Sequence, residues 1–121
     1  MMNPTNRKPH RTLKQQWFHM LLSIADSELH GTAIMEEILL RTDGAIRLWP
    51  GSLYGALGEM VREGLILEVP PPEGAPSEGG KRRFYAITRR GKVVLAEEVS
   101  RMESLVHLAR ARRVGEELKG V

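Results

Sequence analysis

The sequence contains no cysteine, which excludes disulfide bonds and thiolate metal sites. No stretch approaches the roughly 20 apolar residues that a membrane-spanning helix requires, so a membrane protein is excluded. The amino terminus lacks the apolar core of a secretory signal, and we expect a cytoplasmic protein. Aromatic residues are scarce at 5%, yet the 41% of hydrophobic residues suffices for one core in a chain of 121 residues.

Signatures of catalysis are missing as well. The histidines are scattered along the chain, at His10, His19, His30 and His107. No nucleophile elbow, phosphate-binding loop or dinucleotide fingerprint occurs. We therefore expect no enzymatic activity, no metal site and no cofactor.

Basic residues are concentrated in two segments that contain no acidic residue. Residues 1–16 carry four of them and residues 81–92 carry six, while the whole chain has a net charge of only +3. The remainder of the chain is therefore net acidic. Two basic segments on a weakly acidic body indicate a surface that meets a polyanion, whereas the alternative is that both segments are merely solvated.

Apolar residues recur at helical spacing in the first half of the chain. A capping box formed by Thr12 and Gln15 predicts the start of a first helix of about 13 residues. A second helix is predicted at about residues 31–41, and a third at residues 51–62, directly after Pro50, because proline favours the first turn of a helix.

Two short strand-like segments follow, at residues 65–69 and 83–87, and the Pro- and Gly-rich loop 70–80 joins them into a hairpin. A last helix begins after Thr88, which is expected to cap it, and continues to about residue 113. Three short helices, a hairpin and a long helix are the elements of a winged helix-turn-helix. The fold class is therefore mostly α with a small β-hairpin.

One face of the predicted third helix carries no large apolar side chain. Its apolar face consists of Leu53, Ala56, Leu57, Met60 and Val61. The opposite face consists of Gly51, Gly55, Gly58 and Arg62, flanked by Ser52, Tyr54 and Glu59. Mid-helix glycines cost on the order of 1 kcal/mol each relative to alanine, so they indicate a close approach to another surface. That surface is either DNA or a neighbouring element of the same chain, and the sequence leaves both open.

Residues 50–57 (PGSLYGAL) resemble the recognition-helix signature of the PadR-like transcriptional regulators. Three further segments resemble that family and occur in its order: residues 21–31, residues 63–66 (EGLI) and residues 82–91 (RRFYAITRRG). Together the resemblance extends over about residues 13–95.

The chain departs from the family pattern in three places. Thr32 and Ala33 stand where the family usually has an aromatic residue followed by an acidic one, and Gly55 stands where it usually has proline. The proline-rich loop 70–80 is also longer and stiffer than is usual.

The resemblance implies a repressor that binds operator double-stranded DNA as a homodimer, with the third helix in the major groove and the wing along the backbone or minor groove. The DNA-binding residues that it implies are Gly51, Ser52 and Tyr54 in the helix and Lys81, Arg82 and Arg83 in the wing. Gly55 and Arg62, on the same open helix face, complete the candidate set. Two alternatives stay open, namely that Ser52 merely caps the helix and that the Tyr54 ring packs beside Val61.

The last helix carries an apolar seam with 4-3-4-3 spacing, formed by Leu95, Val99, Met102, Val106 and Ala109. A helix of about 25 residues is about 38 Å long, more than a winged helix of about 80 residues can cover. We therefore expect a homodimer interface at this seam, with a contribution from Trp17. The alternative is an amphipathic helix that packs only on its own domain. A single C-terminal helix resembles the short subfamily of these regulators.

The expected domain organisation has three parts. Residues 1–11 form a basic N-terminal arm, residues 12–87 the winged helix-turn-helix DNA-binding domain, and residues 88–121 the C-terminal dimerisation helix and tail. The resemblance also implies a small hydrophobic or aromatic effector. Trp17 or Trp49 could line its site, although both are more typical of a core. The alternative function is a winged-helix interaction module that binds a protein or RNA.

Overall fold

The computed structural model describes residues 12–74 and 83–119. The predicted arm at residues 1–11 lies outside the described residues. The elements follow one another as α1 (Gln15–Ser23), β1 (Leu29–His30), α2 (Gly31–Arg41), α3 (Pro50–Arg62), β2 (Ile66–Val69), β3 (Phe84–Ile87), α4 (Arg89–Ala111) and α5 (Glu116–Lys119). The strands form one antiparallel sheet in the order β1-β3-β2. The predicted winged helix-turn-helix fold is confirmed.

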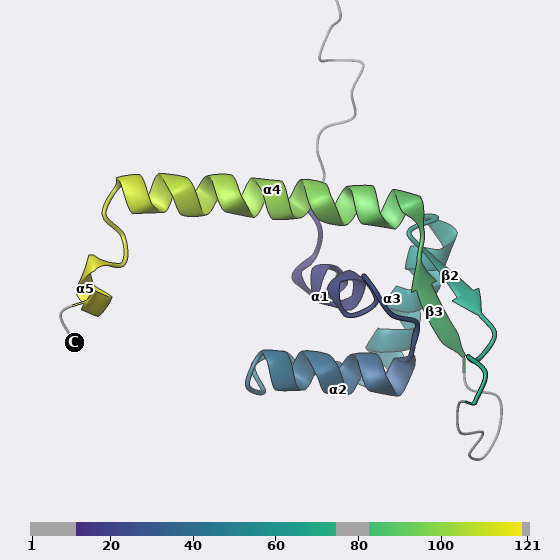
Figure 1. Ribbon diagram of the computed structural model, residues 1–121. Helices are drawn as coiled ribbons and strands as arrows, with labels where there is room; N and C mark the ends of the chain where they lie inside the picture. The colour runs from purple at the N-terminus through teal and green to yellow at the C-terminus, as the bar shows by residue number, and fades with distance from the viewer. Residues whose placement is uncertain (1–11, 75–82, 120–121) are drawn as a thin grey trace, which may run out of the picture.

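The first three helices form a cluster beside the N-terminal half of α4, and β2 and β3 project from one end of it as the wing (Figure 1). The C-terminal half of α4 runs out beyond this cluster, and α5 lies near its far end (Figure 1). Part of α4 is therefore without cover from the described domain.

The core is built from the apolar stripes of α1, α2 and α3, closed by the sheet and the start of α4. Its buried residues are Trp17, Met20, Leu21, Ile24, Ile34, Ile38, Leu48, Leu53, Leu57, Met60, Leu65, Ile66, Tyr85 and Leu95. Each large apolar side chain buried in this way stabilises the fold by about 1.5–3 kcal/mol. The predicted apolar face of α3 is turned inward except at Val61, which is 37% exposed. Val61 lies at the margin of the apolar stripe, where the helix surface turns toward solvent.

The capping box predicted at Thr12 is wrong. Lys14, not Thr12, precedes the helix, and its ψ of 142° shows that the chain is still extended there. The helix therefore begins at Gln15 and has 9 residues, fewer than the pattern predicts. The Lys14 ammonium lies 5.5 Å from the centroid of the Trp17 ring, so a cation–π contact stabilises the segment that leads into α1.

Strand β1 is missing from the sequence-based prediction. Leu29 pairs with Tyr85 and His30 with Phe84, so the expected hairpin is one side of a three-stranded sheet. His30 also caps α2, because its Nδ1 accepts a hydrogen bond from the Ala33 N–H at 3.2 Å. Two residues are too few to show a strand pattern, and only the tertiary pairing defines this strand.

The start of α4 is as predicted. The Thr88 hydroxyl accepts from the Gly91 N–H at 3.0 Å and donates to the Gly64 carbonyl oxygen at 2.6 Å. Gly91 is buried here, and a Cβ on it would overlap the carbonyl oxygen of Leu65 and lie 2.8 Å from Ile87 Cγ1. Only glycine lets α4 approach the sheet this closely.

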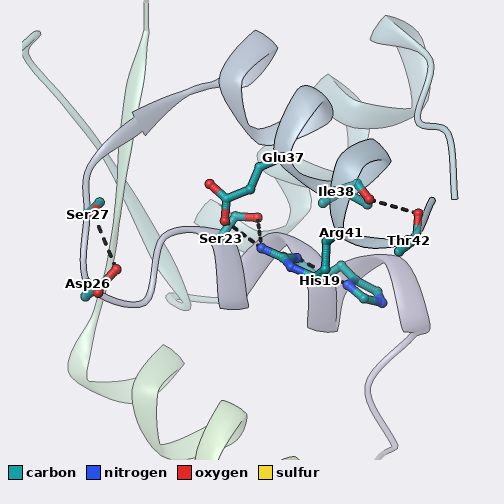
Figure 2. A network of polar contacts seen from close by, with 8 residues as sticks. All are labelled: His19, Ser23, Asp26, Ser27, Glu37, Ile38, Arg41 and Thr42. Carbon is teal, nitrogen blue, oxygen red and sulfur yellow. Dashed lines mark hydrogen bonds and ion pairs between the residues drawn. The ribbon is translucent and has the colours of Figure 1, made fainter. Parts of the chain in front are cut away.

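Arg41 joins α2 to α1 through a polar network (Figure 2). Its Nη1 lies 3.2 Å from His19 Nδ1 and 3.3 Å from the His19 carbonyl oxygen, and its Nη2 donates to Ser23 Oγ at 3.0 Å and to Glu37 Oε1 at 2.6 Å. Because arginine only donates, His19 Nδ1 accepts and is unprotonated. Burial lowers the pKa of His19, and the Arg41 charge lowers it further.

Stability should therefore fall in mild acid. The His19 pKa is lower in the folded protein than the ordinary value of about 6.5 in the unfolded chain, so the unfolded chain binds the proton first as the pH falls. The contribution of His19 to the free energy of unfolding is complete above about pH 7. It is lost as the pH falls through about 6.5 toward the pKa of His19 in the folded protein. Urea unfolding of the parent and of His19→Gln at about pH 7.5 and about pH 5.5 measures it.

We expect His19→Gln to lose less stability between the two pH values than the parent does. His107→Gln, at an exposed position of α4, is the control and should behave as the parent. An identical loss in the parent and in His19→Gln would contradict this role of His19.

Candidate nucleic-acid interface

The glycines of α3 lie on open surface. A Cβ built on Gly51 or on Gly55 meets no atom within 4 Å, and one on Gly58 meets only Arg62 Nη1 at 3.5 Å. Packing against another part of the described chain therefore does not explain them, and that alternative is wrong. The face that includes Arg62 is free for another molecule to approach the backbone of α3.

Ser52 closes the first turn of α3. Its Oγ accepts from the Trp49 N–H at 3.2 Å and donates to the Trp49 carbonyl oxygen at 3.0 Å. The hydroxyl proton is thus used within the chain, as the capping alternative expects. Ser52 is nevertheless exposed, and its role as a DNA contact stays a prediction.

Tyr54 lies against the start of α2. A Cβ on Gly31 would stand 2.7 Å from the Tyr54 hydroxyl oxygen and 2.9 Å from Cζ, so the ring occupies the space above that glycine. The side chain remains 45% exposed. Tyr54 therefore couples the orientation of α3 to α2, while part of its side chain remains exposed.

Of the three predicted wing contacts, Arg83 is described, while Lys81 and Arg82 lie outside the described residues. The Arg83 Nε lies 3.5 Å from Glu68 Oε1 on the adjacent strand β2, and both side chains are exposed. The segment that leads into β3 contains no acidic residue in the sequence. Glu68 is not evident as the partner of Arg83, because the long loop between β2 and β3 hides which residues of the two strands pair. Burial raises the pKa of Tyr85, Glu68 raises it further, and Arg83 opposes them.

The predicted seam of α4 divides into two parts. Leu95 belongs to the core of the domain, as does Trp17 of α1, so neither presents much surface to a partner. Val99 and Val106 are exposed, the latter at 54%, and Met102 and Ala109 are half-buried. Leu105 and Leu108 widen the exposed apolar surface.

Glu98 is the acidic residue buried on α4, beside this surface. Arg101, one turn further on, donates to it through Nε at 3.2 Å and also through Nη2. The pair satisfies a carboxylate that would otherwise be costly to bury, and it raises the pKa of Arg101.

Other kinds of site find no support in the described part of the chain. It contains no group of three or more metal-binding side chains. Each of its helices is too short or too polar to cross a membrane.

A helix cluster, a wing and an open third helix define a winged-helix protein. Residues 20–97 match the sequence model of the transcriptional regulator PadR-like family. The chain belongs to this family, whose members are DNA-binding transcriptional regulators and not enzymes.

Two bacterial proteins are similar in sequence, and one solved structure shares the fold. "Uncharacterized protein X" of Lysinibacillus sphaericus is 31% identical over 80 residues, which are 66% of this chain and 71% of that protein. A 37.1 kDa protein in a transposon of Streptomyces fradiae is 34% identical over 86 residues, 71% of this chain but only 22% of that longer protein. A PadR-like regulator of Bacillus cereus has the same fold, with a TM-score of 0.66, 24% identity and coverage of 82% of this chain and 91% of that one.

Alanine at the open glycines should leave the fold as stable or more stable. Gly55→Ala and Gly58→Ala place a methyl group where no atom obstructs it, and alanine favours a helix by about 1 kcal/mol per position. Urea unfolding measures the change. Gly91→Ala is the control and should destabilise strongly, because its Cβ overlaps the Leu65 carbonyl oxygen. Destabilisation by Gly55→Ala would show that this face is not open.

Removing the acid from the wing should strengthen DNA binding. Glu68→Gln removes the carboxylate that pairs with Arg83. Exposed ion pairs are worth about 0.2–1 kcal/mol, so affinity for duplex DNA should rise roughly two- to fivefold at low salt. Fluorescence anisotropy of a labelled duplex measures it, with Glu97→Gln on the exposed surface of α4 as the control. Equal affinities for the parent and Glu68→Gln would remove Arg83 from the interface.

Proposed function

We propose that this regulator is a repressor that binds operator DNA sequence-specifically as a homodimer, through α3 and the wing. The observation that carries the proposal is the open face of α3, where the backbone at Gly51 and Gly55 has no neighbour within 4 Å of a Cβ position. The major groove is about 12 Å wide and admits one helix. Because three positions of that face are glycine, α3 can lie close to the base edges, with Arg62 on the same face and Ser52 and Tyr54 beside it.

The homodimer part rests on α4. This helix has 23 residues and is about 35 Å long, and its C-terminal half extends beyond the three-helix cluster (Figure 1). Large apolar side chains from the middle of α4 onward are exposed in the single chain, namely Val99, Leu105, Val106 and Leu108. A second copy would bury them and would present two α3 helices to two half-sites of the operator.

Release by a small hydrophobic or aromatic effector is the remaining part of the proposal. The family resemblance supports it, and the apolar interface that two α4 helices would form offers a place for such a compound. Bound there, it could change how the two copies pack and therefore how far apart the two α3 helices lie. Loss of operator binding upon addition of small aromatic compounds tests this part.

Enrichment of bound fragments from the genomic DNA of the source organism tests the function as a whole. We expect a recurring, approximately palindromic sequence, and a duplex of that sequence should bind more tightly than mixed DNA or the matching RNA. Affinity should decrease steeply with salt, because phosphate contacts release counterions. Equal binding to RNA, or no enriched sequence, would instead favour the interaction-module alternative.

A larger side chain on the open face should hinder the approach to the groove. Gly55→Gln is expected to lower operator affinity at least tenfold or to redirect it to another sequence, while the helix remains folded because the position is open. Gel-shift titration measures the affinity. Gly55→Ala and Ala96→Gln, the latter at an exposed position of α4, are the controls and should bind nearly as the parent does. Unchanged binding by Gly55→Gln would place DNA on another face.

A charge in the exposed part of the seam should separate the two copies. Val106→Glu would bury an unpaired carboxylate in the dimer, which costs several kcal/mol. We expect a monomer by light scattering and a large loss of operator affinity, because the two half-sites are then bound independently. Val93→Glu is the control, since Val93 is exposed on α4 outside the seam. A dimeric Val106→Glu at micromolar concentration would place the interface elsewhere.

A further inference from the structure

Trp49 is an exposed aromatic residue at the start of α3. The sequence favours a core position for it, but 64% of the residue is accessible to solvent, whereas the other tryptophan, Trp17, is buried. The guanidinium carbon of Arg47 lies 5.7 Å from the centroid of the Trp49 ring, in the range of a cation–π contact. Neither side chain belongs to the core, so the pair needs an explanation other than packing.

The backbone holds this pair firmly against α3. The Trp49 N–H donates to Ser52 Oγ, and the Trp49 carbonyl oxygen accepts from Ser52 Oγ at 3.0 Å and from the Leu53 N–H at 2.8 Å. On the other side, Leu48 is buried in the core between the two exposed residues. Arg47 and Trp49 are thus an exposed pair on a rigid support, adjacent to the open glycine face.

The electrostatics of this region favour an anionic partner. Between Asp43 and Glu59 the chain contains a single charged side chain, that of Arg47. Within the described residues Arg47 forms no ion pair with a carboxylate, in contrast to Arg83, Arg101 and Arg113. The guanidinium therefore keeps its charge available for a phosphate, which it can bind with two parallel hydrogen bonds.

We propose that Arg47 binds the DNA backbone beside α3, and that Trp49 is the positioning residue that holds its guanidinium. This inference rests on the proposed function, because it places the phosphate at the edge of the groove that α3 enters. The Trp49 ring limits the freedom of the Arg47 side chain, and DNA that contacts Arg47 covers the exposed ring. The pair extends the DNA surface beyond α3 and the wing to the connection between α2 and α3.

Salt dependence of DNA binding tests the role of Arg47. The full chain is titrated against a mixed-sequence duplex of about 30 base pairs at several salt concentrations. Arg47→Ala should lower affinity about tenfold at low salt and reduce the slope of log affinity against log salt by about one. Arg47→Lys should keep the slope, and Trp49→Ala should weaken binding less than Arg47→Ala does. Arg112→Ala, at the far end of α4, is the matched control.

Fluorescence tests the position of Trp49 directly. The chain has two tryptophans, so the difference between the parent and Trp49→Phe isolates the signal of Trp49. Acrylamide should quench this signal strongly in the free protein and at least twofold less when the same duplex is bound. Because Trp17 is buried, its signal should change little.

The outcomes separate this assignment from the proposed function. Three results together would overturn this assignment alone. The duplex binds, acrylamide quenches Trp49 as strongly in the complex as in the free protein, and Arg47→Ala has the same affinity and salt slope as Arg112→Ala. Shielding of Trp49 at high protein concentration without DNA would also overturn it, since the pair would then be a contact between copies. Failure of the parent chain to bind any duplex would overturn the proposed function and this assignment with it.

Discussion

The contacts of Thr88 determine how the functional surfaces of this protein are arranged. Its hydroxyl binds the carbonyl oxygen of Gly64, just after α3 ends, and caps α4 through the Gly91 N–H. Its own N–H donates to the Leu65 carbonyl oxygen at 3.0 Å, beside strand β2. One residue therefore joins α3, the wing and α4, and the missing Cβ of Gly91 lets these parts meet. The open face of α3 and the exposed part of α4 consequently keep a fixed relative orientation.

The helices α3 and α4 each use one face to build the core and leave another face exposed. In α3, Leu53, Leu57 and Met60 are buried, which leaves the glycines outside. In α4, Leu95 anchors the first turns, and the later apolar side chains extend past the domain. The same division that stabilises the fold thus leaves an open face on α3, where we propose DNA binding, and exposed apolar side chains on α4, where we propose a second copy.

Helical spacing predicts α2, α3 and α4 to within two residues at each end, because their apolar stripes are long and periodic. The exposed glycines and the Thr88 cap are also evident from the residues themselves. What the sequence conceals depends on tertiary pairing. Strand β1 exists only beside β3, Glu68 meets Arg83 only across the sheet, and Trp49 is exposed because Leu48 takes the core position next to it. Local patterns carry no information on such neighbours.

The central claim is that α3 meets DNA with its glycine face. Titration of the nitrogen-15-labelled protein with the enriched operator duplex, followed by NMR, tests it directly, because the amides of Gly51 and Gly55 report on that face without any substitution. We expect these amides and those of Ser52 and Tyr54 to shift most, while the amides of the exposed part of α4 change little. Large shifts confined to α4, with the α3 amides unmoved, would contradict it.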